Sequence, residues 1–308
     1  MHSPTASLFA LLLNNAARLT LIRTHTCVAV CALGCRWWDS RSEEVKAQFR
    51  QFVASGQLEF VGGGWSQNDE ANPSPLAVIS QMSSGHGYLK QHFNFTPSVG
   101  WQIDPFGHSS VTPSLFASMG FRALVLNRLH HKVKTQLKNT QMMEFLWQGA
   151  PVSGSASSSR IFTHVLHSHY SAPNSFDWEN WAPRTSPDNV KSRAQELVAI
   201  LKQRAVAYRS RRLLVPWGDD FKFRDARLQF SNMDPIVREI QSNALHYGMN
   251  VSYSTVSEYL NGMERAASKF NVRFPVVVDD FFPYADNEDS YWTGYYTTRP
   301  TLKSTGRR

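Results

Sequence analysis

From residue 37 onward, apolar positions follow either a helical spacing or short continuous runs. Val45, Phe49, Phe52 and Val53 fall on one face of a helix that opens near residue 42, and Gly56 ends it. Further helices are expected at residues 75–93, 113–119, 188–208, 235–247 and 255–267. Strands are expected at residues 58–61, 98–103, 123–126, 145–147, 161–166, 213–216, 251–253 and 274–278, with a Ser- and Gly-rich loop at 151–159.

Strand signals followed by helix signals recur along the chain. This order favours an α/β fold with a largely parallel sheet covered by helices. The strands are short and apolar on both faces, as expected of buried parallel strands. An open doubly wound sheet and a closed barrel both fit the pattern.

Composition narrows the class of protein. The 308 residues are 42% hydrophobic and 18% charged, which is typical of a globular chain with one large domain or two small ones. No run of about 18 apolar residues indicates a transmembrane segment. The net charge of +8 is spread along the chain without a dense basic run, so we do not expect nucleic-acid binding.

The three cysteines, Cys27, Cys31 and Cys35, all precede residue 36. Their four-residue spacing would place them on one helix face. Buried small hydrophobic residues are favoured there over a metal or redox site. The short apolar run at residues 7–13 makes a poor secretory signal, because no basic residue directly precedes it and no clear cleavage site follows.

Polar and aromatic side chains follow the ends of the expected strands. Because active sites of such folds form at the carboxyl ends of the strands, these side chains would converge on one rim. Aromatic rings stack on sugar rings, and two carboxylates can hydrolyse a glycosidic bond, with retention when they lie about 5–5.5 Å apart. The strand ends are followed by Asp104, by Arg128, by His167, His169 and Tyr170, by Asp219 and Asp220, and by Asp279, Asp280 and Tyr284.

Each of these carboxylates also has a structural interpretation. An Asp at a strand end is often a helix N-cap, although Ser109 is a better cap than Asp104. The pair of Asp219 and Asp220 is harder to explain in this way, because adjacent like charges repel.

The basic residues have structural alternatives as well. Arg128 could be a partner in a structural ion pair. His167 and His169 could bind a metal on a strand face, but a surface role is favoured, since one pair does not make a site. His164 could be a buried neutral histidine.

Several motifs resemble glycoside hydrolase family 38 α-mannosidases, in order and spacing, over about residues 37–303. Residues 1–36 are unlike the family, and 304–308 form a polar tail. The resemblance implies the amino-terminal catalytic domain, with a parallel β/α barrel-like fold that here lacks its first strand. The motifs are GGGW at 62–65, NDEA at 68–71, WQIDPFGHS at 101–109, GDDF at 218–221, DFFPYAD at 280–286, YWTGYY at 291–296, and Arg299 with Pro300.

The resemblance also implies an activity and a set of site residues. It implies a retaining α-mannosidase that uses zinc and hydrolyses terminal α-mannosyl linkages of mannose-containing oligosaccharides or N-glycans. Asp104 would be the nucleophile and a zinc ligand, and Asp220 the general acid/base. Substrate would be held by Phe106, Arg128, Tyr170 and Asp219.

The sequence differs from the family in the residues that would bind the metal. The family's His-Asn-Asp-Pro-Gly-Trp motif, which supplies two zinc ligands, does not occur here, nor does the last histidine ligand. Only Asp104 remains of the usual ligands, so we expect weak zinc binding and poor hydrolysis. A catalytically impaired fragment or a mannose-binding pseudoenzyme is the alternative.

The location of the protein follows from the resemblance alone. It implies the secretory pathway, with a lysosome, vacuole or Golgi destination. Sequons at Asn94 and Asn250 permit this location. The oligomeric state is left open.

Overall fold

The structure, a computed structural model, describes residues 26–29, 37–150, 160–210 and 212–305, with backbone alone for residues 26–29. The expectation for Cys27, Cys31 and Cys35 therefore lies outside the described side chains. The strands are β1 (Thr26–Ala29), β2 (Leu58–Val61), β3 (Val99–Gln102), β4 (Ala123–Leu126), β5 (Glu144–Gln148), β6 (Arg160–Val165) and β7 (Val276–Val277). The helices are α3 (Glu43–Ala54), α4 (Pro75–Phe93), α5 (Val111–Ser118), α6 (His131–Asn139), η2 (Asn174–Phe176), α7 (Val190–Ala205), α8 (Ala226–Ser242), α9 (Ala244–Tyr247), α10 (Val256–Lys269), α11 (Gly294–Thr297) and α12 (Pro300–Thr305).

The described strands form a mostly parallel arrangement, as the sequence predicted. β1 and β2 pair in parallel, and a second sheet has the order β3-β4-β6-β5-β7. Within that sheet only β5 and β6 pair in antiparallel fashion. The two sheets meet where the Gly62 amide donates to the Val99 carbonyl at 2.8 Å.

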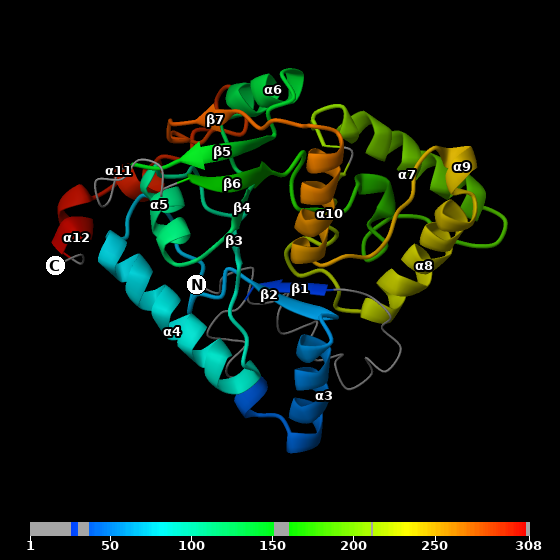
Figure 1. Ribbon diagram of the computed structural model, residues 1–308, viewed down its shortest axis with the longest axis horizontal. Helices are drawn as coiled ribbons and strands as arrows, with labels where there is room; N and C mark the ends of the chain where they lie inside the picture. Colours follow the sequence, from blue (N-terminus) through cyan, green and yellow to red (C-terminus); the bar gives the residue numbers. More distant parts are fainter. Residues whose placement is uncertain (1–25, 30–36, 151–159, 211, 306–308) are drawn as a thin grey trace.

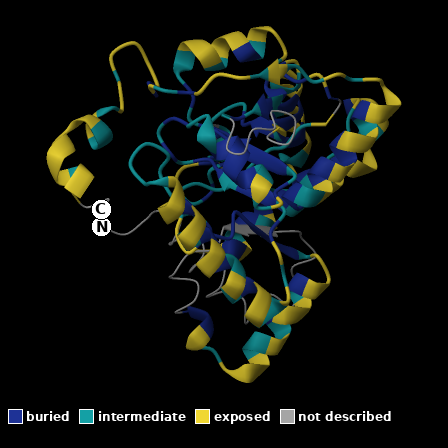
Figure 2. Cartoon of the chain, turned by 60° about the vertical axis from the view of Figure 1, so that its left-hand side comes forward, coloured by how far each residue is buried: buried dark blue, intermediate teal, exposed yellow. Residues whose placement is uncertain are grey.

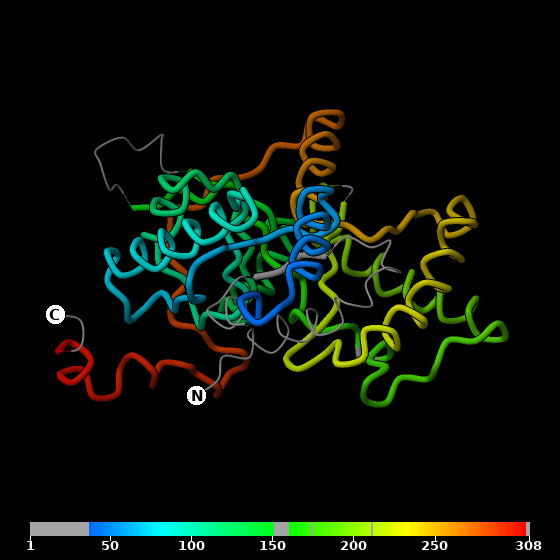
Figure 3. The backbone as a smooth tube through the Cα atoms, turned by 90° about the horizontal axis from the view of Figure 1, so that it is seen from below, coloured from blue at the N-terminus to red at the C-terminus, as the bar shows by residue number. Residues whose placement is uncertain are grey.

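Helices cover the strands from several sides (Figure 1). α3 and α4 lie beside the β1–β2 sheet, while α7, α8 and α9 gather at the opposite end of the molecule from α11 and α12 (Figures 1 and 3). The strands in the centre are buried and the outward faces of the helices are exposed (Figure 2). None of the helices in the described part of the chain is long and apolar enough to cross a membrane.

The side chains of β4 explain how the central sheet is buried on both faces. Because successive side chains of a strand point to opposite faces, Leu124 and Leu126 pack in one apolar cluster with Phe116 of α5. Val125 packs in another cluster, with Leu260 of α10. The strand therefore reads as continuously apolar, and the prediction of buried strands is confirmed.

Two glycines permit close approaches that shape the site. A Cβ on Gly85 of α4 would come 2.1 Å from the Gly63 carbonyl oxygen, so only glycine lets α4 pack this closely on the loop after β2. Gly107 has φ +97°, and a Cβ there would meet the Phe282 ring at 2.5 Å.

Most predicted elements up to residue 205 are confirmed within a few residues. Helix α3 begins after Ser42, whose hydroxyl accepts the Val45 amide, and α4 begins at Pro75. The sequence predicted no strand before residue 37, yet β1 lies there beside β2. Helices α6, α11 and α12 were also not predicted, and α12 reaches into the expected polar tail.

Two predictions in the C-terminal third are wrong, because residues 213–216 and 251–253 are not strands. The predicted strand at 274–278 is confirmed in a shorter form, as β7. Leu213, Val215 and Trp217 pack against the α7–α8 cluster while Leu214 packs against the α10 cluster, so the side chains alternate as in a strand. No described strand lies alongside to complete a ladder, and alternation alone does not make a strand.

The predicted helix start at Pro235 is also wrong. Helix α8 begins at Ala226, because the Asp225 carboxylate caps it by accepting the Leu228 amide at 3.0 Å. Pro235 lies inside the helix rather than at its first turn.

Candidate active site

The carboxylate of Asp104 lies at the carboxyl end of β3 and is held by two neighbouring strand ends. Arg128, which follows β4, donates to Oδ1 from both Nη2 (2.6 Å) and Nε (3.1 Å). The Tyr170 hydroxyl, which follows β6, donates to the same oxygen at 3.0 Å. Because β3, β4 and β6 are parallel neighbours, their ends meet on one rim, as the sequence predicted.

Arg128 is an ion-pair partner and also part of an aromatic pocket. Its guanidinium carbon lies 4.9 Å from the Phe106 ring centre, 5.8 Å from that of Tyr170 and 6.0 Å from that of Tyr284. Burial opposes its charge, but hydrogen bonds to Asp104 and Tyr284 outweigh burial and raise the pKa of Arg128. Arg128 therefore stays positively charged and fixes one oxygen of Asp104. No described residue bonds to the other oxygen, Oδ2.

Asp220 lies near enough to Asp104 for the two charges to interact. Partial burial, then the charge of Asp104, then that of Asp219 raise the pKa of Asp220, and Arg128 opposes this shift. Burial and the charge of Asp104 also raise the pKa of the Tyr170 hydroxyl. The two carboxylates are therefore coupled electrostatically across one site, which suits one charged and one protonated carboxyl group.

Asp219 shapes the loop that presents Asp220. Its carboxylate accepts the Ser171 hydroxyl and, at 2.7 Å, the backbone amide of Asp220. The loop is strained, because Asp219 (φ 147°), Phe221 (φ 59°) and Phe223 (φ 60°) all have positive φ without being glycine. Strain of this kind is common where a loop aims a functional side chain.

An aromatic wall stands beside Asp104. The Phe106 ring lies 4.7 Å from that of Trp292, 5.7 Å from that of Tyr295 and 6.2 Å from that of Tyr284. The exposed face of Trp292 is suited to stacking on a sugar. Trp292 and Tyr295 belong to the motif at residues 291–296, and the sequence predicted no role for either of them.

Glu70 belongs to the motif at residues 68–71, and its carboxylate accepts four hydrogen bonds from residues around the Asp104 loop. Its side chain is 1% exposed, and its Oε1 atom lies 2.9 Å from Nδ1 of His108. His108 is fully buried in the same loop that carries Asp104. The loop is therefore anchored from behind by a group that does not face the open site.

The three candidate histidines each have a protein partner. His164 is buried and contacts Glu144 at 3.2 Å, in line with a structural role. His169 contacts the Asn127 amide at 3.2 Å and His167 contacts the Ser168 hydroxyl at 3.0 Å. The pair of His167 and His169 belongs to no metal-binding cluster among the described residues.

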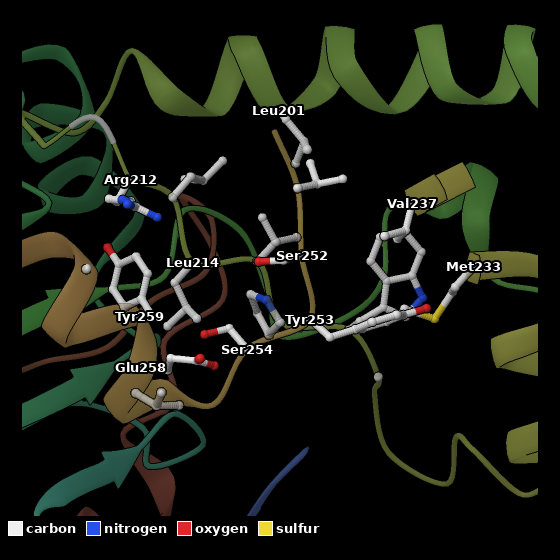
Figure 4. Close-up of a pocket in the computed structure, with 18 of the residues that line it drawn as sticks. Leu201, Arg212, Leu214, Met233, Val237, Ser252, Tyr253, Ser254, Glu258 and Tyr259 are labelled. Carbon is white, nitrogen blue, oxygen red and sulfur yellow. The ribbon is translucent and has the colours of Figure 1, made fainter. Parts of the chain in front are cut away.

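A cavity of about 1090 Å³ adjoins the site between α7, α8 and α10. Asp219, Asp220 and Tyr170 line it, but Asp104 and Arg128 do not. Figure 4 shows its interior, with Leu201 of α7, Met233 and Val237 of α8, and Tyr259 of α10 around the hollow. The cavity follows residues 212–217, and its lining is mostly apolar.

The described residues do not form the zinc site that the resemblance implies. No group of three or more His, Cys, Asp or Glu side chains that could hold a metal occurs in the described ranges. The Oδ1 atom of Asp104 is also bonded to a guanidinium, which would repel a cation placed there. Zinc binding by this chain stays a prediction.

Comparison with known proteins shows the family to which this chain belongs. Residues 22–287 match the glycosyl hydrolases family 38 N-terminal domain, and the match includes residues 22–36, which were expected to lie outside the resemblance. The lysosomal alpha-mannosidase of Dictyostelium discoideum is 38% identical over 275 residues, covering 87% of this chain and 26% of that protein. The epididymis-specific alpha-mannosidase of Homo sapiens is 35% identical over 298 residues, covering 88% of this chain and 29% of that protein.

Solved structures agree on the fold. An alpha-mannosidase from Enterococcus faecalis superposes with a TM-score of 0.61 at 16% identity, covering 90% of this chain and 28% of that one. A 4-alpha-glucanotransferase from Thermococcus litoralis gives a TM-score of 0.55 at 14% identity, covering 89% of this chain and 37% of that one. The chain spans about a quarter of the length of the curated relatives it matches.

Proposed function

Because this chain belongs to glycosyl hydrolase family 38, we propose that it carries the sugar-cleaving site of a retaining α-mannosidase acting on mannose-containing glycans. The observation that carries the proposal is the carboxylate of Asp104, which Arg128 and Tyr170 hold by one oxygen at the rim of the sheet, beside the aromatic wall. The raised pKa of Asp220 supports its role as the partner acid. Retention needs a charged nucleophile and a protonated acid in the same site.

In the proposed reaction, Asp104 attacks the anomeric carbon. Arg128 and Tyr170 hold Oδ1, so the attacking atom is the unbonded Oδ2. The bond from the anomeric carbon to the leaving oxygen breaks as Asp220 gives that oxygen its proton. The product is a mannosyl ester of Asp104 and a free alcohol.

The second step releases mannose. Asp220, now ionised, takes a proton from a water molecule, and the resulting oxygen nucleophile attacks the anomeric carbon. The ester bond to Asp104 breaks, and the sugar leaves with its original configuration. Asp220 is protonated again, ready for the next cycle.

The other site residues bind the sugar or adjust the pKa of Asp220. We propose that Asp219 accepts hydrogen bonds from sugar hydroxyls and that Phe106 packs against the sugar ring. Asp219 also raises the pKa of Asp220, after burial and Asp104, which keeps the acid protonated to higher pH. No step is assigned to a metal ion.

The alternative is a mannose-binding protein with impaired catalysis. It is favoured by the ion pair of Arg128 with Asp104, which places a positive charge against one oxygen of that carboxylate. Hydrolysis of p-nitrophenyl α-D-mannoside, with and without added zinc, separates the two. Turnover supports the hydrolase; a rise in melting temperature with mannose and no turnover in either condition supports the binding protein.

The location of the protein is part of the same proposal. Both sequon asparagines, Asn94 and Asn250, are exposed, at the end of α4 and after α9. We propose that the protein passes through the secretory pathway, towards a lysosome or a related compartment. A mass loss on enzymatic removal of N-glycans from the native protein tests this.

A further inference from the structure

Behind the Asp104 loop lies a second carboxylate, that of Glu70, for which the chemistry above has no role. Its Oε1 atom accepts the Gln102 amide at 3.0 Å and His108 Nδ1 at 2.9 Å. Its Oε2 atom accepts the Ser109 backbone amide at 2.9 Å and the Thr112 hydroxyl. Four donors thus converge on one buried carboxylate.

These donors come from both sides of Asp104. Gln102 is the last residue of β3 and lies two residues before Asp104. His108 and Ser109 lie after Asp104, in the loop that carries it. Thr112 belongs to the first turn of α5. One side chain therefore fixes the strand end, the loop and the next helix relative to each other.

The same anchor reaches the other wall of the site. The His108 amide donates to the Phe281 carbonyl at 3.3 Å, and the Phe281 amide donates back to the His108 carbonyl at 2.9 Å. Phe281 lies three residues before Tyr284, whose ring centre is 6.0 Å from the guanidinium carbon of Arg128. Glu70 is thus linked, through His108, to both the loop that carries the nucleophile and the segment that supports its arginine partner.

We propose that Glu70 is a positioning residue for the reaction, which fixes the attacking oxygen of Asp104 without touching the sugar. This inference rests on the proposed function, since the group it positions is the proposed nucleophile. The geometric demand is strict, because a displacement of about 1 Å in a reacting group can slow a reaction roughly a hundredfold.

A purely structural role for Glu70 is tested with a matched control in the same chain. Glu59 of β2 is another buried glutamate, and it accepts the Ser257 amide at 3.0 Å and the Ser257 hydroxyl. It joins β2 to α10 rather than to the Asp104 loop. Glu59→Gln and Glu70→Gln both keep the side-chain volume and replace an acceptor oxygen by an amide group that faces donors.

The kinetic arm measures kcat, KM and the melting temperature of both variants with p-nitrophenyl α-D-mannoside. We expect Glu70→Gln to lower kcat about ten- to a hundredfold with little change in KM, because binding contacts are retained while attack is misaligned. We expect Glu59→Gln to keep kcat within about twofold at a similar loss of melting temperature. Equal kcat in the two variants would overturn the proposal.

A second arm does not need turnover. Hydrogen exchange, read by mass spectrometry, should accelerate in Glu70→Gln across residues 103–112 and 279–285 and stay slow across 123–126. In Glu59→Gln the acceleration should fall on residues 256–262 instead. If the wild-type chain hydrolyses nothing, the proposed function fails while this arm still decides the anchor: unchanged exchange at residues 103–112 would overturn it.

Discussion

The two carboxylates of the site are supported in opposite ways. Asp104 lies at the end of a paired parallel strand, and its side chain is bonded by Arg128 and Tyr170. Asp220 follows residues 212–217, which have no strand partner among the described elements, and it sits in a loop with three non-glycine residues at positive φ.

This difference fits the catalytic role proposed for each of the two carboxylates. A nucleophile needs a fixed position, which hydrogen bonds to a rigid rim supply. A general acid needs a raised pKa, which partial burial and the neighbouring charges of Asp104 and Asp219 supply. The Asp104 side is thus positioned by bonding, and the Asp220 side is tuned by its electrostatic surroundings.

The largest effect should come from Asp104→Asn. We expect a loss of at least about a thousandfold in kcat/KM, because an amide cannot form the sugar ester, while Arg128 keeps a partner for its hydrogen bonds. Steady-state kinetics on an α-mannoside checks this, with circular dichroism to verify folding. Activity near that of the wild type would remove Asp104 from the nucleophile role.

The next effect concerns the acid. Asp220→Asn should slow hydrolysis of p-nitrophenyl α-mannoside about a hundred- to ten-thousandfold, the typical contribution of acid–base catalysis. The formation of the sugar ester should be slowed far less when the leaving group is dinitrophenol, which departs without a proton. Equal losses of that first step for both substrates, measured by the burst of released phenol, would contradict the assignment.

The dependence of activity on pH tests whether the neighbouring charges raise the pKa of Asp220. Asp220 must be protonated, so activity should fall as pH rises through its raised pKa. Asp219→Asn removes one charge that raises this pKa, so the falling limb should move to lower pH. A limb that stays in place, in kcat/KM measured across pH, would show that Asp219 does not tune Asp220.

The smallest effect concerns the backbone. Phe221 is 52% exposed at φ 59°, so Phe221→Gly loses little burial and relieves strain. We expect the free energy of unfolding to change by less than about 1 kcal/mol, with the sign favouring the variant. The matched change on the other side, Gly107→Ala, should destabilise clearly, because its Cβ would strike Phe282. Urea unfolding of both variants checks this; equal effects would mean that the two loops are held alike.

The sequence predicted the Asp104 side better than the Asp220 side, for a physical reason. Short apolar runs such as residues 123–126 give strands when neighbours are available, and polar residues after parallel strands then meet at one rim. Residues 213–216 have the same pattern but no described neighbour, so no strand forms. Local pattern cannot reveal which partner a strand finds.

Other features depended on contacts that no local signal carries. The role of Glu70 arises from donors 32 to 42 positions away in the chain. The sequence predicts a helix start at Pro235, whereas α8 begins after the Asp225 cap, ten residues earlier. The roles of Asp104, Asp220 and the substrate-binding residues stay predictions that the geometry supports.

Capture of the sugar ester tests the central claim most directly. A fluorinated α-mannosyl donor with a good leaving group slows both steps, and the second more than the first, so a covalent intermediate accumulates. Peptide mass spectrometry should then find one fluorosugar on the peptide that carries Asp104, and none on this peptide in Asp104→Asn. A label on another residue, or steady turnover that gives the inverted sugar without any label, would contradict the account.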